Sequence, residues 1–225
     1  MRTAFGIHDF AYRPFTDDAD RALPEVLLND HYRFGDLAAM ALLSRRREAH
    51  LFDVSAHIGA FASRMKREIP WLETHAYEPE VSNFHHLCYN IGHLPGVRLQ
   101  RKAVGESSKM VKLNMSEHTM KHRIRLQGEG TEVEMVDLLA LLNRHRHRQS
   151  FIILRIDLGR YEYPVLPLLD LGPVDLLVLE GCDGFENPSP LVTSQGLTFW
   201  FHPFGTDQHA VYVRKYPGFM SELLK

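Results

Sequence analysis

The sequence predicts a single α/β domain built on a seven-stranded, mostly parallel sheet, with helices on both faces and a C-terminal antiparallel hairpin. Three observations support this prediction. Short apolar segments alternate with amphipathic helical segments, which is typical of repeated βα units in a doubly wound sheet. The segments 151–157 and 174–180 are almost entirely apolar, as expected of strands covered on both faces. The length of 225 residues suits one large domain better than two small ones.

The first half of the chain begins with an arm, followed by alternating helices and strands. Residues 1–24 are aromatic, polar and irregular, and we expect them to precede a single domain over 25–225. Apolar residues at helical spacing predict three helices, at 34–42, 58–69 and 81–91. The third of these is expected to direct inward Val81, Phe84, Leu87, Cys88 and Ile91. Apolar runs predict strands at 51–54, 74–78 and 97–104. The arginine run 45–47 is either a phosphate-binding patch or, as we favour, a solvated helix end.

The second half continues this alternation. Apolar and polar residues alternate over 109–115, which predicts a half-buried strand, and the polar stretch 116–130 predicts a variable loop or β-excursion. Asp137 is expected to cap a helix that runs through Leu142. The remaining expected elements are a short helix at 161–169, buried strands at 151–157 and 174–180, and hairpin strands at 197–202 and 210–215.

Composition narrows the class of protein. The formal net charge of -2 gives no overall basic field, so nucleic acid is an unfavoured partner. The N-terminus has no continuous apolar signal region, and no apolar run in the chain is long enough to cross a bilayer. Cys88 and Cys182 form no close-spaced redox or metal motif. We therefore expect a soluble, cytoplasmic protein without membrane contact, and the sequence is compatible with a homodimer.

Five of the predicted strands end in residues that could contact a ligand. These residues are Asp53 to Gly59, Glu78, Ala103 to Gly105, Asp157 and Glu180. Ligands of doubly wound sheets bind beyond the carboxyl ends of the strands, so we expect these residues to share one rim. The turn after Asp53 offers backbone amides at a helix N-terminus, and an acid such as Glu78 can accept hydrogen bonds from a ribose diol. The order and spacing indicate a ligand that contains adenosine.

Several of these segments together resemble one family. The run 51–59, Leu-Phe-Asp-Val-Ser-Ala-His-Ile-Gly, is similar to the D-V-G-A-N-I-G motif of FkbM-type S-adenosylmethionine-dependent methyltransferases. The resemblance continues through 76–80 and 102–105 and ends at 155–162, Arg-Ile-Asp-Leu-Gly-Arg-Tyr-Glu, which is similar to the family's K-I-D-V-E-G-x-E. It implies a Rossmann-like class I methyltransferase fold with S-adenosyl-L-methionine as cofactor. It also implies O-methylation of a sugar, polyketide or other small hydroxyl compound.

The resemblance also implies roles for individual residues. It assigns to the cofactor site Asp53, Ser55, His57, Gly59, Glu78, Pro79, Asn83 and Val104, with Glu78 at the ribose. It places Asp157 and Glu162 in the motif that faces the methyl donor and acceptor, and Asp157 is the preferred base.

Two departures from the family motifs fall inside this site. Ser55 replaces a glycine whose missing Cβ ordinarily lets the backbone approach the cofactor. Gly159 and Arg160 stand where the family has Glu and Gly. Arg160 is expected either to pair with Asp157 or to anchor an anionic acceptor through its guanidinium. These departures favour an alternative function, a methyltransferase-fold binding or regulatory protein that no longer methylates.

The remaining signals are weaker. His57 is either a base or a hydrogen-bonding residue of the turn. The basic stretch 144–148 is interpreted as a solvated connection rather than an RNA-binding loop. The histidines considered as metal ligands are His85, His86, His118, His122 and His209, and none lies in a complete metal-ligand motif. No metal is therefore assigned from the sequence.

Overall fold

The fold was analysed in a computed structural model. It describes residues 2–5, 8–11, 30–44, 46, 48–114, 123–125, 130–145, 150–157, 166–180, 189–205 and 209–215. Arg45 and Arg47, Arg160 and Glu162, and most of the expected helix at 161–169 lie outside these residues. Of that helix, the structure describes a 3-10 turn, η1 (Leu166–Leu168).

The central sheet has seven strands, as predicted. Their order is β12-β13-β11-β10-β3-β4-β5. The strands are β3 (Glu48–Val54), β4 (Glu73–Tyr77), β5 (Val97–Gln100), β10 (Ser150–Ile156), β11 (Leu176–Leu179), β12 (Leu197–Phe201) and β13 (Ala210–Arg214). Pairing is parallel from β11 to β5, and β13 is antiparallel to both of its neighbours. The chain runs outward from β3 to β5 and returns to β10 beside β3, so strand order reverses at the β3–β10 pair.

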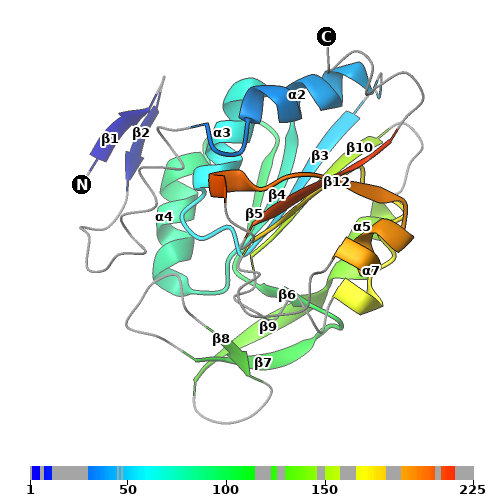
Figure 1. Ribbon diagram of the computed structural model, residues 1–225. Helices are drawn as coiled ribbons and strands as arrows, with labels where there is room; N and C mark the ends of the chain where they lie inside the picture. The colour runs from blue at the N-terminus through cyan, green and yellow to red at the C-terminus, as the bar shows by residue number, and fades with distance from the viewer. Residues whose placement is uncertain are drawn as a thin grey trace.

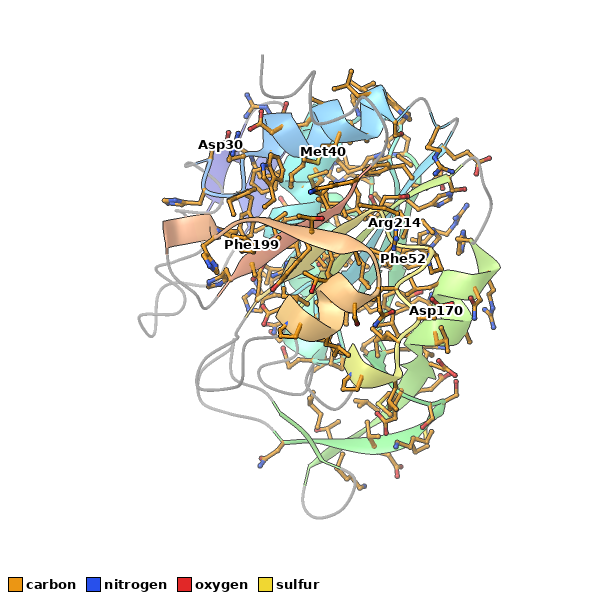
Figure 2. All side chains as sticks on the ribbon, turned by 45° about the vertical axis from the view of Figure 1, so that its right-hand side comes forward. Asp30, Met40, Phe52, Asp170, Phe199 and Arg214 are labelled. Carbon is orange, nitrogen blue, oxygen red and sulfur yellow. The ribbon has the colours of Figure 1, made fainter. Side chains whose placement is uncertain are left out.

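Helices cover both faces of this sheet (Figure 1). One face packs against α2 (Phe34–Leu43), α3 (Ala60–Glu68) and α4 (Val81–Ile91). The other packs against α5 (Leu138–Arg144) and α7 (Ser189–Ser194). Figure 2 labels one core residue from each side, Met40 of α2 and Phe52 of β3. Among the described residues, no helix combines the length and apolarity needed to cross a membrane.

The helix signals in the sequence were largely correct. The Asp137 side chain accepts a hydrogen bond from the Ala140 N–H and so caps α5, as predicted. In α4 the prediction was partly wrong, because Val81 and Cys88 are exposed whereas Leu87 and Ile91 are buried. The apolar stripe of this helix is thus narrower than its composition indicates.

A second sheet accounts for the main errors in the strand prediction. It has the order β6-β9-β7-β8, with β6 (Ala103–Gly105), β7 (Lys109–Asn114), β8 (Arg123–Arg125) and β9 (Thr131–Asp137), and lies below the central sheet in Figure 1. The expected single strand 97–104 is two strands, because β5 ends where its partner β4 ends and β6 pairs with β9 instead. Strand β9 was not predicted, although its Val133 and Met135 alternate with glutamates in the manner of a half-buried strand.

The N-terminal arm is not irregular throughout. Strands β1 (Arg2–Phe5) and β2 (His8–Ala11) form an antiparallel hairpin, and β2 contacts α4. Aromatic residues mixed with polar ones gave no clear alternation, so this hairpin was not evident from the sequence.

Candidate functional site

The loop between β3 and α3 has an unusual backbone. Ser55 and His57 have φ angles of 62° and 53°, and Gly59, the N-cap of α3, has a φ of 88°. Glycine adopts this left-handed region readily and asparagine more often than most residues, whereas serine and histidine do so at a cost. The motif that this loop resembles has Gly and Asn at positions 55 and 57. Serine and histidine therefore hold backbone conformations here that glycine and asparagine adopt more readily.

Neighbouring elements hold this loop in place. The Ala56 N–H donates to the Tyr77 carbonyl at 2.9 Å, and the Asn90 side-chain amide donates to the Ile58 carbonyl at 2.8 Å. A Cβ on Gly59 would lie 2.8 Å from Leu87 Cδ1, so glycine also permits the close approach of α3 and α4. The loop thus lies at the carboxyl end of β3, directly beside the end of β4.

Glu78, at the end of β4, connects the two strand ends. Its carboxylate accepts hydrogen bonds from the backbone N–H of His57 at 2.9 Å and of Glu80 at 3.0 Å. Burial raises the pKa of Glu78 to about 7, and the two backbone N–H bonds oppose this rise only in part. Glu80 in turn caps α4 by accepting from the N–H groups of Ser82 and Asn83. A hydrogen bond from the Asn83 side chain also opposes the rise in the pKa of Glu78.

Arg155 of β10 forms the centre of a buried ionic network. Its guanidinium donates to Asp53 at 2.8 Å, to both oxygens of Glu180 at 2.7 and 2.8 Å, and to Asp157 at 3.3 Å. The same group donates to the Ser55 carbonyl at 3.3 Å, which joins the network to the loop. Parallel pairing of β3 and β10 sets Asp53 directly opposite Arg155. The network therefore lies at the reversal of strand order, where doubly wound sheets bind ligands.

Burial and charge compete within this network. Burial raises the pKa of Asp53, although the charge of Arg155 lowers it. Burial also opposes ionisation of Glu180, but the charge and hydrogen bonds of Arg155 outweigh it and leave the pKa of Glu180 lowered. Arg155 stays protonated, because Glu180 and Asp53 raise its pKa against the effect of burial. Three carboxylates surround one guanidinium, so the network has a formal excess of negative charge.

Aromatic side chains support the network from the α2–α3 side. The Tyr32 hydroxyl donates to Glu180 at 2.6 Å, and the Arg155 guanidinium lies over the Phe61 ring at 5.4 Å from its centroid. Burial, followed by the charge of Glu180, raises the pKa of Tyr32 well above its usual value. The Tyr32 and Phe61 rings meet edge to face at 5.3 Å.

Two residues of this network, Arg155 and Tyr32, had no role predicted from the sequence. The signal for Arg155 was a charged residue inside the otherwise apolar segment 150–156, since a buried arginine requires ionic partners. Tyr32 had no comparable signal, because its contact with Glu180 joins residues far apart in the chain.

The residues assigned to the cofactor site fall into two groups. The loop residues Ser55, His57 and Gly59 lie together with Glu78, and Pro79 and Asn83 are buried directly behind it. Asp53 is 0% exposed and is bound by Arg155, and Val104 is a core residue of β6 packed in the same cluster as Val54 and Tyr77.

The residues assigned to catalysis are described only in part. Asp157 lies at the end of β10, where its carboxylate contacts Arg155 and its side chain is 26% exposed. Arg160 and Glu162 lie outside the described residues. The partner of Asp157 that the structure describes is thus Arg155, not the Arg160 considered from the sequence.

Comparison with known proteins gives a likeness in structure. No protein-family model matches the chain, and no relative was found by sequence among characterised proteins. One structural neighbour is Pyrococcus horikoshii Trm1 in complex with S-adenosyl-L-methionine, at 13% identity over 100% of this chain and 64% of that chain, with a TM-score of 0.49. Another is Geobacter metallireducens precorrin-6y C5,15-methyltransferase, at 11% identity over 73% and 72%, with a TM-score of 0.39. A third is Aeropyrum pernix fibrillarin with bound S-adenosyl-L-methionine, at 13% identity over 77% and 72%, with a TM-score of 0.41. The predicted Rossmann-like class I methyltransferase fold is confirmed by the strand order of this chain with its antiparallel β13.

Proposed function

We propose that this chain binds S-adenosyl-L-methionine at the carboxyl ends of β3 and β4 and transfers its methyl group to a hydroxyl of a small molecule. The observation that carries the proposal is the left-handed loop 55–59, which is tied to Glu78 by the His57 N–H. This loop joins the carboxyl end of β3 to the start of α3, where doubly wound sheets bind their ligands, and the acid beside it suits a ribose diol. The FkbM-like motifs in the same segments support the same assignment.

The residues of the network fit this cofactor electrostatically. S-adenosyl-L-methionine supplies an electrophilic methyl group on a positively charged sulfur. A formal excess of carboxylates over guanidinium at the β3–β10 edge favours a cationic ligand there. Ser55 to Gly59 would contact the adenosine and methionine portions, and Glu78 would accept hydrogen bonds from the ribose.

Asp157 is the proposed base. Of the three carboxylates on Arg155, the side chains of Asp53 and Glu180 are 0% and 9% exposed, whereas that of Asp157 is 26% exposed. Only a carboxylate within reach of the acceptor can take its proton as the hydroxyl oxygen bonds to the methyl carbon and the carbon–sulfur bond breaks. Arg155 would hold the Asp157 carboxylate in place for this transfer, with Arg160 and Glu162 completing the acceptor side.

A second function has support from two observations. Arg155 already engages Asp157, and Ser55 occupies a strained backbone position where the motif has glycine. Both features suit a protein that binds the cofactor or a related nucleoside without transferring the methyl group.

For the enzyme, the proposed acceptor is a sugar, polyketide or other small hydroxyl compound, because the net charge of -2 does not favour nucleic acid.

Calorimetric titration with S-adenosyl-L-methionine and S-adenosylhomocysteine tests the proposal. Glu78→Ala should weaken binding by about 1.5–3 kcal/mol, since hydrogen bonds to a carboxylate are lost. Glu132→Ala, an exposed carboxylate of β9, is the matched control and should bind like the wild type.

The outcomes separate the two functions. If the wild type binds S-adenosyl-L-methionine and methylates a hydroxyl acceptor, and Asp157→Asn abolishes the methylation, the enzymatic function is supported. Binding without transfer to any hydroxyl acceptor supports the non-catalytic protein. A folded wild-type chain that binds neither ligand would overturn both.

A further inference from the structure

Three histidines from separate elements meet on the other face of the central sheet. His50 lies in β3, His75 in β4 and His145 directly after α5. One ring nitrogen from each lies within 4.8 Å of the other two. The ring centroids are 4.8 Å apart for His75 and His145, and 4.9 Å apart for His50 and His145. This cluster is distinct from the Arg155 network and has no part in the proposed function.

Two of these histidines bury nitrogen atoms that lack hydrogen-bond partners. His50 and His75 are 7% and 6% exposed. Within the part of the chain that the structure describes, His50 Nδ1 and His75 Nε2 have no hydrogen-bond partner. Leaving such an atom buried and unsatisfied costs about 1–3 kcal/mol, so each instance in a native protein calls for an explanation.

The surroundings of His50 match those of a metal ligand. Its Nε2 lies 3.4 Å from a Glu48 carboxylate oxygen, which leaves Nδ1 for the interior of the cluster. Histidines that bind metals commonly donate their second ring N–H to a carboxylate, which fixes the tautomer and the ring orientation. Glu48 is itself held by the Ser150 hydroxyl at 3.2 Å.

Charged side chains lie beside the cluster. Glu48 of β3 contacts His50, as described above. Arg98 of β5 is the strand partner of His75 and is paired with Glu73 of β4 at 3.3 Å.

Aromatic packing alone explains only part of the arrangement. Phe52, labelled in Figure 2, stacks on the His75 ring at 4.9 Å with an interplanar angle of 9°. This contact accounts for one face of the His75 ring. It provides no hydrogen-bond partner for His75 Nε2 or for His50 Nδ1.

We propose that His50, His75 and His145 bind a divalent transition metal, with Zn²⁺ as the preferred ion, and that the metal fastens the end of α5 to β3 and β4. Three imidazoles suit Zn²⁺, and water can complete a tetrahedron. Zn–N bonds of about 2.0–2.1 Å place tetrahedral ligand atoms about 3.4 Å apart. The ligand atoms lie within 4.8 Å of one another, so each pair would close by at most about 1.4 Å on binding. His145 is half-buried at a helix end and is the residue best placed to move.

Cobalt titration of the full chain tests this site directly. The tag-free protein is stripped of metal with a chelator, dialysed and titrated with Co²⁺, whose visible absorption reports tetrahedral coordination. We expect one Co²⁺ per chain with visible bands, displacement of the Co²⁺ by Zn²⁺, and a higher melting temperature with either metal because the ion binds only the folded chain.

Two variants and a matched control assign the site. His145→Gln and His50→Gln should each weaken Co²⁺ binding by at least about tenfold and remove the visible bands, because each lacks one ligand. His86→Gln, on α4 with its ring bonded to the Ser82 carbonyl, should bind Co²⁺ like the wild type. Circular dichroism checks that each variant is folded.

Either of two results would overturn the proposal. One is a folded wild-type chain that gives no Co²⁺ bands and no metal-dependent rise in melting temperature. The other is Co²⁺ binding that His145→Gln and His50→Gln leave equal to that of His86→Gln. Either result would show that the three rings are a packed aromatic group and not a metal site.

Discussion

Replacing Arg155 with methionine keeps much of the apolar volume of the side chain but removes the cation from three carboxylates. In the wild type the guanidinium makes contacts of 2.7–2.8 Å with Glu180 and Asp53 and a longer one of 3.3 Å with Asp157. Asp53 is fully buried and Glu180 nearly so, and water therefore cannot replace the lost partner. Asp157 is more exposed and should contribute less to the effect.

The expected loss of unfolding free energy is about 3–5 kcal/mol near neutral pH, the range for breaking a buried ion pair on one side only. For a domain of this size each kcal/mol shifts the melting temperature by about 2–4 °C, so the variant should melt about 6–20 °C lower. Thermal and urea unfolding followed by circular dichroism measure this difference.

The pH dependence of the loss has a defined sign. Without the cation, the pKa of the Asp53 and Glu180 carboxyl groups rises, so the folded variant binds protons more readily than the unfolded chain. A group with a raised folded pKa contributes stability that is present at low pH and lost as pH rises. The gap between variant and wild type should therefore narrow as the pH falls from about 7 to about 5.

A surface cation provides the control for Arg155. Lys102→Met removes an ion pair with Glu134 that is largely open to solvent, and should cost no more than about 1 kcal/mol. Adding Glu180→Gln to Arg155→Met should restore part of the lost stability, because one uncompensated charge is removed. A loss for Arg155→Met no larger than that of the control, or one independent of pH, would refute this reasoning.

Three further substitutions test the loop and its supports. Ser55→Gly should raise the unfolding free energy by about 0.5–1 kcal/mol in urea, because relief of a left-handed residue exceeds the entropy cost of glycine, whereas Ser82→Gly in α4 should lower it. S-adenosyl-L-methionine should bind Ser55→Gly at least as tightly, and a clear loss of affinity would indicate a contact with the serine hydroxyl. The pKa of Glu78 is raised from its usual 4.5 to about 7, so the protonated side chain stabilises the folded chain by on the order of 3 kcal/mol, and this stability is lost as pH rises through 7. In Glu78→Gln the unfolding free energy should therefore depend less on pH between about pH 5 and 8. An unchanged pH dependence would contradict the assignment. Tyr32→Phe, which removes the hydroxyl bonded to Glu180, should cost about 1.5–3 kcal/mol by thermal melting, and a neutral result would mean that the bond adds nothing.

Local pattern was enough to predict most of the fold. Strands β10 and β11 and helices α3 and α5 each have an apolar period or a capping residue that lies within the element itself. The segment 97–104 shows the limit of this reasoning. Its apolar run indicated a strand, but which neighbour each part pairs with depends on where β4 ends and on the distant β9.

The site was predicted in part for the same reason. Asp53 lies near the end of β3, and Glu78 and Asp157 directly follow β4 and β10. The parallel topology alone requires such residues to share an edge. The left-handed φ of Ser55 was not predictable, because serine gives no sign of a conformation that the surrounding contacts impose. The contacts of Arg155 depend on strand register and on a tyrosine far away in the chain.

The two polar clusters use opposite faces of the same strands. Side chains alternate along a strand, so in β3 Asp53 faces α3 together with Arg155, whereas His50 and Phe52 face α5. One strand can therefore carry a buried ionic network on one side and a histidine cluster on the other without direct contact between them. Metal binding at the histidines acts on the proposed cofactor loop and on Glu78 through the positions of β3 and β4. Because each of these strands is hydrogen-bonded on both edges, they resist such displacement, and the two clusters should contribute independently to stability.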